Sequence, residues 1–294
     1  MLKYSQFLKN IYGEKVYKIP VNTGGTCPNR DGTKGHGGCI FCSEIGTGFE
    51  LLPETTDFLT QMEQNISYIR SRYKANRYLI YFQNFTATYL PLEQFRAYLE
   101  KVKLVDNVVG VCVSTRPDCL AGGHLELLKE FQREGYDIFI ELGLQSANDD
   151  TLKKINRGHT VAEYIQGAKL VKEYGFYLDT HLILNLPWDT REDVTAAAHL
   201  MNQVHTDSVK LHSLHIPYGT KLCQMYENGE FSIVPKEEYF HRLYLFLEIL
   251  DSTVAVQRLF SRAPKEDTAF CNWQTSWWKL EEEFFRYRDS LRGI

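Results

Sequence analysis

Short apolar runs, rich in β-branched and aromatic residues, alternate along this chain with segments whose apolar residues recur at helical spacing. The runs predict strands at residues 16–21, 77–83, 108–115, 137–144, 176–184 and 209–216. The segments between them predict helices at residues 55–74, 91–103, 123–134, 160–174 and 191–205. An uninterrupted apolar run such as 108–115 indicates a strand buried on both faces, as parallel sheets require. Six strand–helix cycles therefore predict an α/β fold built from βαβ units, an open or closed barrel.

The pattern changes after residue 233. A helix is expected at 236–250 and a strand at 254–260, followed by a turn-rich stretch and a helix rich in Trp and Phe. We therefore expect residues 1–233 to form a partial, TIM-like (β/α)6 barrel, and residues 234–294 to form a C-terminal helical extension packed on it.

Composition and charge narrow the class of protein. The 294 residues include 33 Lys and Arg against 37 Asp and Glu, a formal charge of −4. This mild acidity argues against a protein that holds nucleic acid by bulk charge, and no DNA partner is expected. No apolar run approaches the ~20 residues of a membrane helix. The first residues contain no apolar signal segment, so we expect a cytoplasmic protein without membrane contact.

The seven cysteines are the first chemical signal. An odd number in a chain of this kind argues against a disulfide framework and favours metal ligands or reactive thiols. Cys27, Cys39 and Cys42 lie in the glycine-rich segment 24–48, directly after the first expected strand. Glycines allow a loop to fold tightly around an inorganic centre, and functional loops of α/β barrels follow the strands. The segment therefore predicts a metal centre.

Two metals fit this spacing. Three thiolates leave one iron of a four-iron cubane open to an outside ligand such as S-adenosylmethionine (SAM), which binds through its amino and carboxylate groups. Alternatively, Cys27, His36, Cys39 and Cys42 form a tetrahedral zinc site. Three unrelated buried thiols are the remaining interpretation. The spacing by itself leaves these alternatives open, because C-x2-C occurs in both metal classes.

Two further segments have a simpler interpretation. His212 and His215 are three residues apart on one expected strand, so they should point to opposite faces and form no metal site. One of the two is expected to face the barrel interior. The segment 70–78 interleaves Arg and Lys with Tyr, which permits RNA binding. A solvated helix face is the interpretation that we favour for it.

The cysteine loop on an alternating strand–helix chain resembles the radical SAM superfamily. Its eleven-residue gap between the first two cysteines is similar to that of the YhcC/YtqA-like subgroup, which lies near the Elongator catalytic subunit and the oxygen-independent coproporphyrinogen oxidases. The resemblance extends from TCPNRDG to QRL at residues 257–259. It implies that Cys27, Cys39 and Cys42 hold a 4Fe–4S cluster and that SAM binds its open iron. It also implies that a flavodoxin- or ferredoxin-type donor supplies one electron, and that a 5′-deoxyadenosyl radical abstracts a hydrogen atom from a substrate inside the barrel.

The resemblance also implies SAM contacts. The segment 137–159 resembles the stretch E-x-G-x-Q-S…N-R-x-H, in which the Gln and Arg touch SAM, here Gln145 and Arg157. A guanidinium binds a carboxylate such as that of SAM through two hydrogen bonds. Glu141 lies on the same strand, where its carboxylate would accept hydrogen bonds from ribose hydroxyls. A buried partner of a nearby Lys or Arg is the alternative role of Glu141.

Three other strand ends carry candidates. Ser114 begins an S-T-R-P-D element similar to that of the Elongator-like group and is expected to contact ribose. Residues 81–86 stand where many relatives have Gly-Gly-Glu, which leaves Gln83 and Thr86 as the candidates there. His181 begins a strand that backs the adenine in relatives, and either binds the cofactor or is a core histidine. Asn185 stands at the usual glycine position of that element.

The resemblance leaves several substrates open. Kinship with the Elongator subunit implies tRNA, specifically the side chain at C5 of a wobble uridine. Kinship with the coproporphyrinogen oxidases implies a small metabolite or a tetrapyrrole. A zinc-stabilised RNA-binding module without catalysis is the third possibility. The motifs identify residues that bind the cluster and SAM, but they identify no catalytic side chain.

Overall fold

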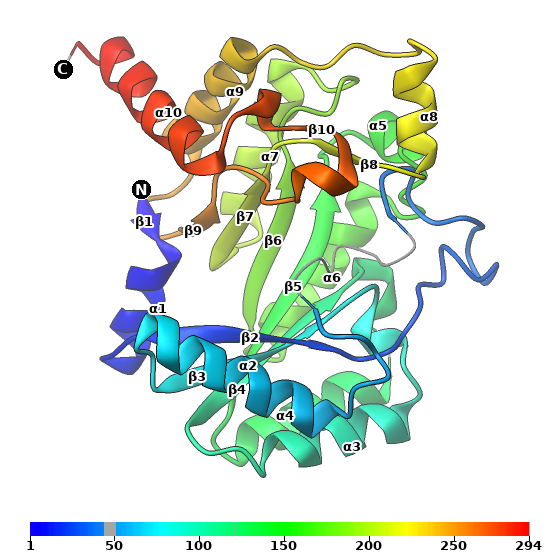
Figure 1. Cartoon of the computed structure of the whole chain (residues 1–294), viewed down its shortest axis with the longest axis vertical. Coiled ribbons are helices and arrows are strands. Elements are labelled where there is room, and N and C mark those ends of the chain that lie inside the picture. Colours follow the sequence, from blue (N-terminus) through cyan, green and yellow to red (C-terminus); the bar gives the residue numbers. More distant parts are fainter. Residues whose placement is uncertain (44–50, 121, 294) are drawn as a thin grey trace.

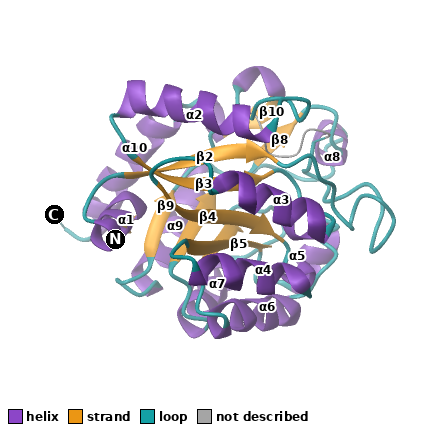
Figure 2. Ribbon diagram, turned by 90° about the horizontal axis from the view of Figure 1, so that it is seen from below, coloured by secondary structure: helices purple, strands orange, loops and turns teal. Residues whose placement is uncertain are grey.

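The computed structural model describes residues 1–43, 51–120 and 122–293 and consists of one curled parallel sheet with helices outside it (Figures 1 and 2). The sheet has eight strands in the order β1-β9-β7-β6-β5-β4-β3-β2, and every neighbouring pair is parallel. The strands are β1 (Leu2–Lys3), β2 (Val16–Asn22), β3 (Arg77–Gln83), β4 (Val108–Thr115), β5 (Asp137–Gln145), β6 (Tyr177–Ile183), β7 (Ser208–His212) and β9 (Ala255–Arg258). The predicted partial barrel is confirmed.

Helices follow most strands and cover the convex face of the sheet (Figure 2). The α-helices of the described residues are α1 (Tyr4–Tyr12), α2 (Phe58–Tyr73), α3 (Leu92–Val102), α4 (Gly123–Arg133), α5 (Asp149–Lys154), α6 (Val161–Glu173), α7 (Arg191–Gln203), α8 (Lys221–Glu227), α9 (Lys236–Ile249) and α10 (Trp277–Leu291). Short 3-10 turns lie at η1 (Ala87–Tyr89), η2 (Pro117–Cys119), η3 (Lys265–Asp267) and η4 (Asn272–Gln274). None of the helices in the described part of the chain is long and apolar enough to cross a membrane.

Both faces of the central strands are buried, as the apolar runs predicted. On β4, Val111 and Val113 pack into the helical layer, whereas Cys112 between them faces the concave side. At the base of the concave side, Tyr4 and Leu8 of α1 pack in the same cluster as Cys112. Helix α1 therefore covers one end of the curled sheet.

The segment after residue 233 contributes to the sheet as well as packing outside it. Strand β9 lies between β7 and β1, and it pairs with both in parallel. Helix α9 packs against α7, and Phe240 of α9 contacts Phe284 of α10 through their rings, whose centroids are 5.8 Å apart. Two strands, β1 and β9, thus join the six of the predicted barrel.

The strand predicted at 209–216 divides into two. Strand β7 ends at His212, and β8 (His215–Pro217) pairs instead with β10 (Thr268–Cys271) in a separate antiparallel pair. Side chains hold the chain at this break, because Asn185 Oδ1 accepts from the Leu214 N–H at 2.6 Å and Ser213 Oγ accepts from the Ser261 N–H at 3.0 Å. These bonds satisfy buried groups that a continuous ladder would otherwise pair.

Candidate active site

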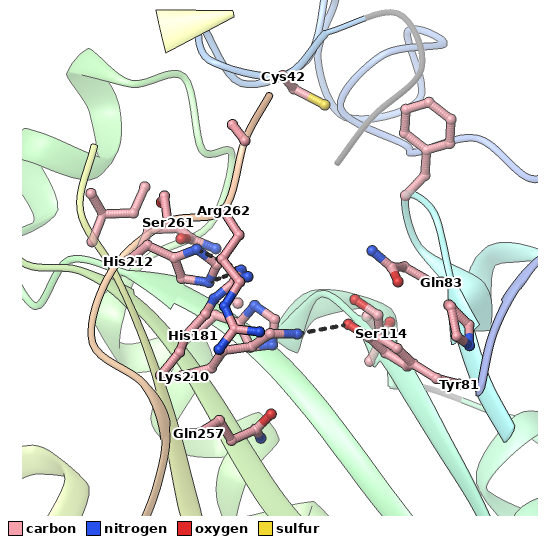
Figure 3. Close-up of a pocket in the computed structure, with 18 of the residues that line it drawn as sticks. Cys42, Tyr81, Gln83, Ser114, His181, Lys210, His212, Gln257, Ser261 and Arg262 are labelled. Carbon is pink, nitrogen blue, oxygen red and sulfur yellow. Dashed lines mark hydrogen bonds between the residues drawn. The ribbon is translucent and has the colours of Figure 1, made fainter. Parts of the chain in front are cut away.

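The concave face of the sheet encloses a cavity of about 680 Å³ (Figure 3). Strands from both halves of the sheet contribute to its walls. The contributing side chains include Lys18 of β2, Tyr81 of β3, Ser114 of β4, His181 of β6, Lys210 of β7 and Gln257 of β9. In Figure 3, Gln83 and Ser114 lie on one wall, and His181, His212 and Arg262 lie on the other. The cavity is therefore the interior of the half-barrel.

The three predicted metal-ligating cysteines all line this cavity, and each sulfur lies close to one arginine. Cys27 and Cys39 are buried and Cys42 is partly exposed. The nitrogen–sulfur pairs are Arg116 Nη1 with Cys27 Sγ at 4.0 Å, Arg157 Nη1 with Cys39 Sγ at 3.6 Å, and Arg30 Nη1 with Cys42 Sγ at 3.5 Å. Thiolates that bind iron concentrate negative charge, and three guanidiniums are placed to offset it.

Asn29 holds the cysteine loop in place. Its side chain is buried and donates from Nδ2 to the Asn156 carbonyl at 2.6 Å, while its own carbonyl accepts from the Gly38 N–H at 2.8 Å. Gly158 has a φ of +72°, and a Cβ there would lie 2.6 Å from Asn29 Oδ1. A glycine is thus required at this position both for its backbone conformation and for space.

The zinc alternative does not fit this geometry. His36 is exposed, and its ring lies against Gly32 rather than in the cavity. Among the described residues, Cys112, Glu141 and Asp179 are the only group of three or more His, Cys, Asp or Glu residues whose ligand atoms all lie within 4.8 Å of one another. Ligands of a tetrahedral zinc site lie about 3–4 Å apart, as bond lengths of ~2.0–2.3 Å require. The three cysteines with His36 therefore form no such site.

Arg116 is a residue whose importance the sequence analysis missed. It is almost fully buried and donates to the carbonyls of Arg157 at 2.8 Å and Gly158 at 3.0 Å. Its Nε also donates to Asp118 at 2.9 Å. Burial alone would raise the pKa of Asp118, but Arg116 and then Lys34 lower it to about 2. The S-T-R-P-D element, which contains Arg116, was the available signal. Its arginine joins the end of β4 to the loop at residues 157–158.

Six of the seven predicted cofactor contacts line the cavity. They are Gln83, Thr86, Ser114, Gln145, Arg157 and His181. Two of them carry buried polar atoms that have no hydrogen-bond partner within the described part of the chain, namely Thr86 Oγ1 and Arg157 Nε. Buried polar atoms are rarely left unpaired in a native protein, so such atoms point to a missing ligand or water.

Gln145 and Arg157 are brought together by Gly143. Arg157 Nη2 donates to the Gly143 carbonyl at 2.6 Å. A Cβ on Gly143 would lie 2.5 Å from Arg157 Nη2 and 2.7 Å from Gln145 Nε2. Gln145 itself has a φ of +78°, which is unusual for a residue other than glycine, and the pairing of β5 with β6 shifts register here. Strained backbone of this kind is concentrated at functional sites.

Glu141 occupies a different position from the other candidates, because it lies beneath the cavity wall and does not line it. It is 1% exposed. Its carboxylate accepts hydrogen bonds from five side chains: Lys18, Tyr81, Cys112, His181 and Lys210. Burial would raise the pKa of Glu141, but Lys18, Lys210 and His181 hold it well below its ordinary value. This is the environment of a buried counter-ion.

A second buried carboxylate extends this network. Asp179 accepts from Ser208 Oγ at 2.5 Å, from Gln257 Nε2 at 2.9 Å and from Lys18 Nζ at 3.3 Å. Tyr4 of α1 donates to it at 3.2 Å. The network therefore joins α1, β2, β6, β7 and β9 across the base of the half-barrel, where only paired charges are tolerated.

Both His212 and His215 line the cavity, so the prediction of opposite faces was wrong. The physical reason is the break after His212, which ends the strand alternation on which that prediction depended. Arg258 Nη2 lies 2.9 Å from His212 Nδ1 and donates to it. Burial, and then the charge of Arg258, hold the pKa of His212 well below its ordinary value, so this ring is neutral.

Lys210 gives the cavity a pH-dependent charge. Burial lowers its pKa from 10.5 to about 8, against the opposing effect of Glu141. Between these two values the unfolded chain holds a proton that the folded chain has lost, so the contribution of Lys210 to stability rises with pH. We therefore compare the free energies of unfolding of the wild type and Lys210→Met. As the pH rises across this window, the wild type should gain stability relative to the variant, by at most about 1.4 kcal/mol per pH unit. Urea unfolding of both proteins from pH 7 to 10 measures this gain. If the two free energies of unfolding change equally with pH, the prediction is wrong.

The cavity wall is strongly cationic. Seven of the residues that line it are lysine or arginine, and none of the described lining residues is aspartate or glutamate. The seven are Lys18, Arg30, Arg116, Arg157, Lys210, Arg258 and Arg262. This is a local concentration of positive charge in a chain whose formal charge is −4. Such a wall focuses the electric field and attracts anions.

Comparison with known proteins agrees with the resemblance stated from the sequence. A family model described as the Radical SAM superfamily matches residues 21–201, and a second, described as the Radical_SAM C-terminal domain, matches residues 206–286. The uncharacterized protein YtqA of Bacillus subtilis is 33% identical, over 93% of this chain and 84% of its own length. Protein YhcC of Escherichia coli is 36% identical, over 78% of this chain and 72% of its own length.

More distant matches share only part of their length with this chain. A tRNA uridine(34) acetyltransferase of Dehalococcoides mccartyi is 28% identical over 47% of this chain and 31% of its own length. The structure of Methanocaldococcus infernus Elp3 with an N-terminal deletion superposes with a TM-score of 0.70 at 18% identity, covering 95% of this chain and 63% of that one. The structural match establishes a shared fold.

Proposed function

The chain belongs to the radical SAM superfamily, whose enzymes use a 4Fe–4S cluster and S-adenosylmethionine, and on this premise we propose that its substrate is the wobble uridine of tRNA, modified at the C5 side chain. The observation that carries the proposal is the cationic wall of the cavity, which includes Arg258 and Arg262 in addition to Lys18 and Lys210, paired with Glu141, and Arg116, paired with Asp118. A polynucleotide presents phosphates at every residue, and lysine and arginine are the side chains that bind them. The tRNA uridine(34) acetyltransferases among the relatives support the choice of nucleotide.

The cluster would be held by Cys27, Cys39 and Cys42. Three thiols that face one cavity, each beside a guanidinium, provide the donor set and the compensating charge for an iron–sulfur cubane with one open vertex. When bound, the cluster supplies the electron that cleaves SAM and releases a 5′-deoxyadenosyl radical. The reaction needs an external low-potential reductant, for which a flavodoxin or a ferredoxin is our proposal.

The residues around the cysteines would bind and orient SAM. The unpartnered Nε of Arg157 suits the SAM carboxylate, and the unpartnered Oγ1 of Thr86 suits one of its polar groups. Gln145 lies beside Arg157 across Gly143, and Ser114 and Gln83 lie on the neighbouring strand ends, where ribose hydroxyls would meet amide and hydroxyl groups. Glu141 acts indirectly in this proposal, because it fixes His181 and Lys210 on the wall that faces the substrate.

His181 and Lys210 would manage protons at the substrate. His181 Nε2 donates to Glu141 at 2.5 Å, and burial lowers the pKa of His181 to about 4, so the neutral ring presents an acceptor nitrogen near neutral pH. Lys210, with its pKa of about 8, donates to Glu141 at 3.2 Å and to Tyr81 Oη at 3.3 Å. A proton acceptor and a cationic donor thus occupy one wall.

Nucleoside profiles of tRNA test the substrate. In a strain that lacks the gene, we expect a wobble-uridine derivative to disappear and its precursor to accumulate, as measured by liquid chromatography and mass spectrometry of digested tRNA. The wild-type gene should restore the profile, and the Cys39→Ala gene should not. A tRNA profile identical to that of the parent strain would reject the tRNA proposal, and small anionic substrates would then be the class to examine.

A further inference from the structure

Three tyrosines form a cluster of rings at the edge of the cavity, where α2 packs over β2. The rings of Tyr17 and Tyr73 stack with their centroids 4.8 Å apart and an angle of 23° between the planes. Tyr68 meets Tyr73 edge-on at 6.5 Å. All three line the cavity, and Tyr68 is 55% exposed. We call these three residues, with Lys15 and Arg72, the tyrosine platform.

The two cations of the platform lie among its rings. Lys15 Nζ is 5.9 Å from the centroid of Tyr17 and 5.8 Å from that of Tyr73. The Arg72 guanidinium is 5.9 Å from the centroid of Tyr68 and 5.8 Å from that of Tyr73. Within the described ranges, neither cation forms an ion pair with a carboxylate, and both side chains are exposed. Lys15 Nζ donates to the Tyr73 carbonyl at 2.8 Å, a bond that does not neutralise its charge, so both cations can attract an anionic partner.

Only part of the basic segment 70–78, which the sequence analysis considered for RNA binding, belongs to the platform. Tyr78 is fully buried, and its hydroxyl accepts from Arg70 Nε at 3.2 Å. Arg77 pairs with Glu14 at 2.8 Å. Arg70, Arg77 and Tyr78 thus have structural partners, whereas Arg72 and Tyr73 belong to the platform.

The opposite edge of the cavity carries a matching pair. The Arg262 guanidinium lies 4.0 Å from the ring centroid of Trp277, which is 36% exposed at the start of α10. Arg262 lines the same cavity as the platform tyrosines. Strand β2, over which α2 packs, and strand β9, which precedes Arg262, lie near opposite ends of the sheet order, and α10 lies above α2 in Figure 1. Exposed rings in contact with cations thus border the cavity at both edges.

We propose that the tyrosine platform stacks the unpaired bases of an RNA strand beside the nucleotide that enters the cavity, and that Lys15 and Arg72 contact its phosphates. The inference rests on the proposed function and adds to it the surface that receives the RNA. Proteins that bind single strands combine aromatic rings, on which successive bases stack, with basic groups that follow the backbone. The platform has both, because the ring of Tyr68 is 55% exposed and Arg72 has no carboxylate partner among the described residues.

The test measures binding of the reconstituted holoenzyme to a fluorescent tRNA anticodon stem–loop by anisotropy. We expect Tyr68→Ala to weaken binding by about tenfold, since the loss of one base–aromatic stack is of that order. Tyr68→Phe keeps the ring and should bind like the wild type. We expect Arg72→Gln to reduce the slope of log affinity against log salt concentration by about one, as the loss of one phosphate contact requires. Because Tyr68 is exposed on a helix and alanine favours helices, Tyr68→Ala should fold normally.

Tyr218→Ala is the matched control, because Tyr218 is 56% exposed and does not line the cavity. It should bind RNA like the wild type. Iron content and release of 5′-deoxyadenosine without RNA should be the same in all variants, and affinity for a loop-free RNA duplex should not respond to Tyr68→Ala. If Tyr68→Ala binds the stem–loop as tightly as the wild type, the platform proposal is wrong while the tRNA proposal stands. If the wild type itself does not bind the stem–loop, both proposals fail.

Discussion

The Cys39→Ala variant is expected to hold no stable iron–sulfur cluster after anaerobic reconstitution, whereas the wild type takes up about four irons per chain and turns brown. Cys39 is the most deeply placed of the three cysteines, with 7% exposure, and it lies beside Arg157 and the buried Asn29. Removing it leaves two thiols, and two thiolates do not hold a cubane against competing thiols in solution. Release of 5′-deoxyadenosine from SAM under reducing conditions should fall below detection.

The control for this prediction is Cys271→Ala. Cys271 is partly buried on β10 and does not line the cavity, so its removal should change neither iron content nor SAM cleavage. The iron assay, the visible spectrum and chromatography of the nucleoside product together make the measurement. Uptake of zinc but not of iron by the wild type, with loss of that zinc in Cys39→Ala, would contradict the cluster assignment.

Replacement of Glu141 by leucine is expected to lower the free energy of unfolding by about 3–5 kcal/mol, the usual cost of removing one partner from a buried ion pair. Glu141 neutralises Lys18 and Lys210 at the base of the half-barrel, where its own side chain is fully buried and those of the two lysines are 16% and 14% exposed. Without it, one carboxylate, Asp179, remains in this network for the two largely buried lysine side chains. Glu141→Gln keeps the shape and part of the hydrogen bonding, so its effect should be smaller.

Urea unfolding of the cluster-free protein, followed by circular dichroism, measures this effect. Glu100→Gln is the control, since Glu100 pairs with Lys103 at the surface and its loss should cost less than about 1 kcal/mol. Addition of Lys210→Met to Glu141→Leu should recover part of the loss, because it removes one of the uncompensated charges. A Glu141→Leu protein as stable as the wild type would show that the buried charge network does not support the base of the fold.

The local order of elements follows from the sequence. Strands β3 and β4 coincide with the apolar runs that predicted them. Helices α6 and α7 begin within one residue of the predicted starts, at the capping boxes of Thr160 and Thr190. Helix periodicity and capping depend on neighbours within a few residues, so the chain itself carries this information. The spacing of Cys27, Cys39 and Cys42 is local in the same way and identifies the metal-binding loop.

Tertiary structure alone decided which distant groups meet. The insertion of β9 between β7 and β1 is a pairing between the two ends of the chain, which no local pattern records. The break after His212 depends on side chains from other loops, and it turned both histidines into the cavity. Glu141 and Arg116 acquired their roles because buried charges require partners, and those partners come from strands and loops far away in the sequence. The local sequence thus determines the helices, the strands and the cysteine loop. The positive charge of the cavity arises only in the folded sheet, because its lysines and arginines come from distant strands and loops.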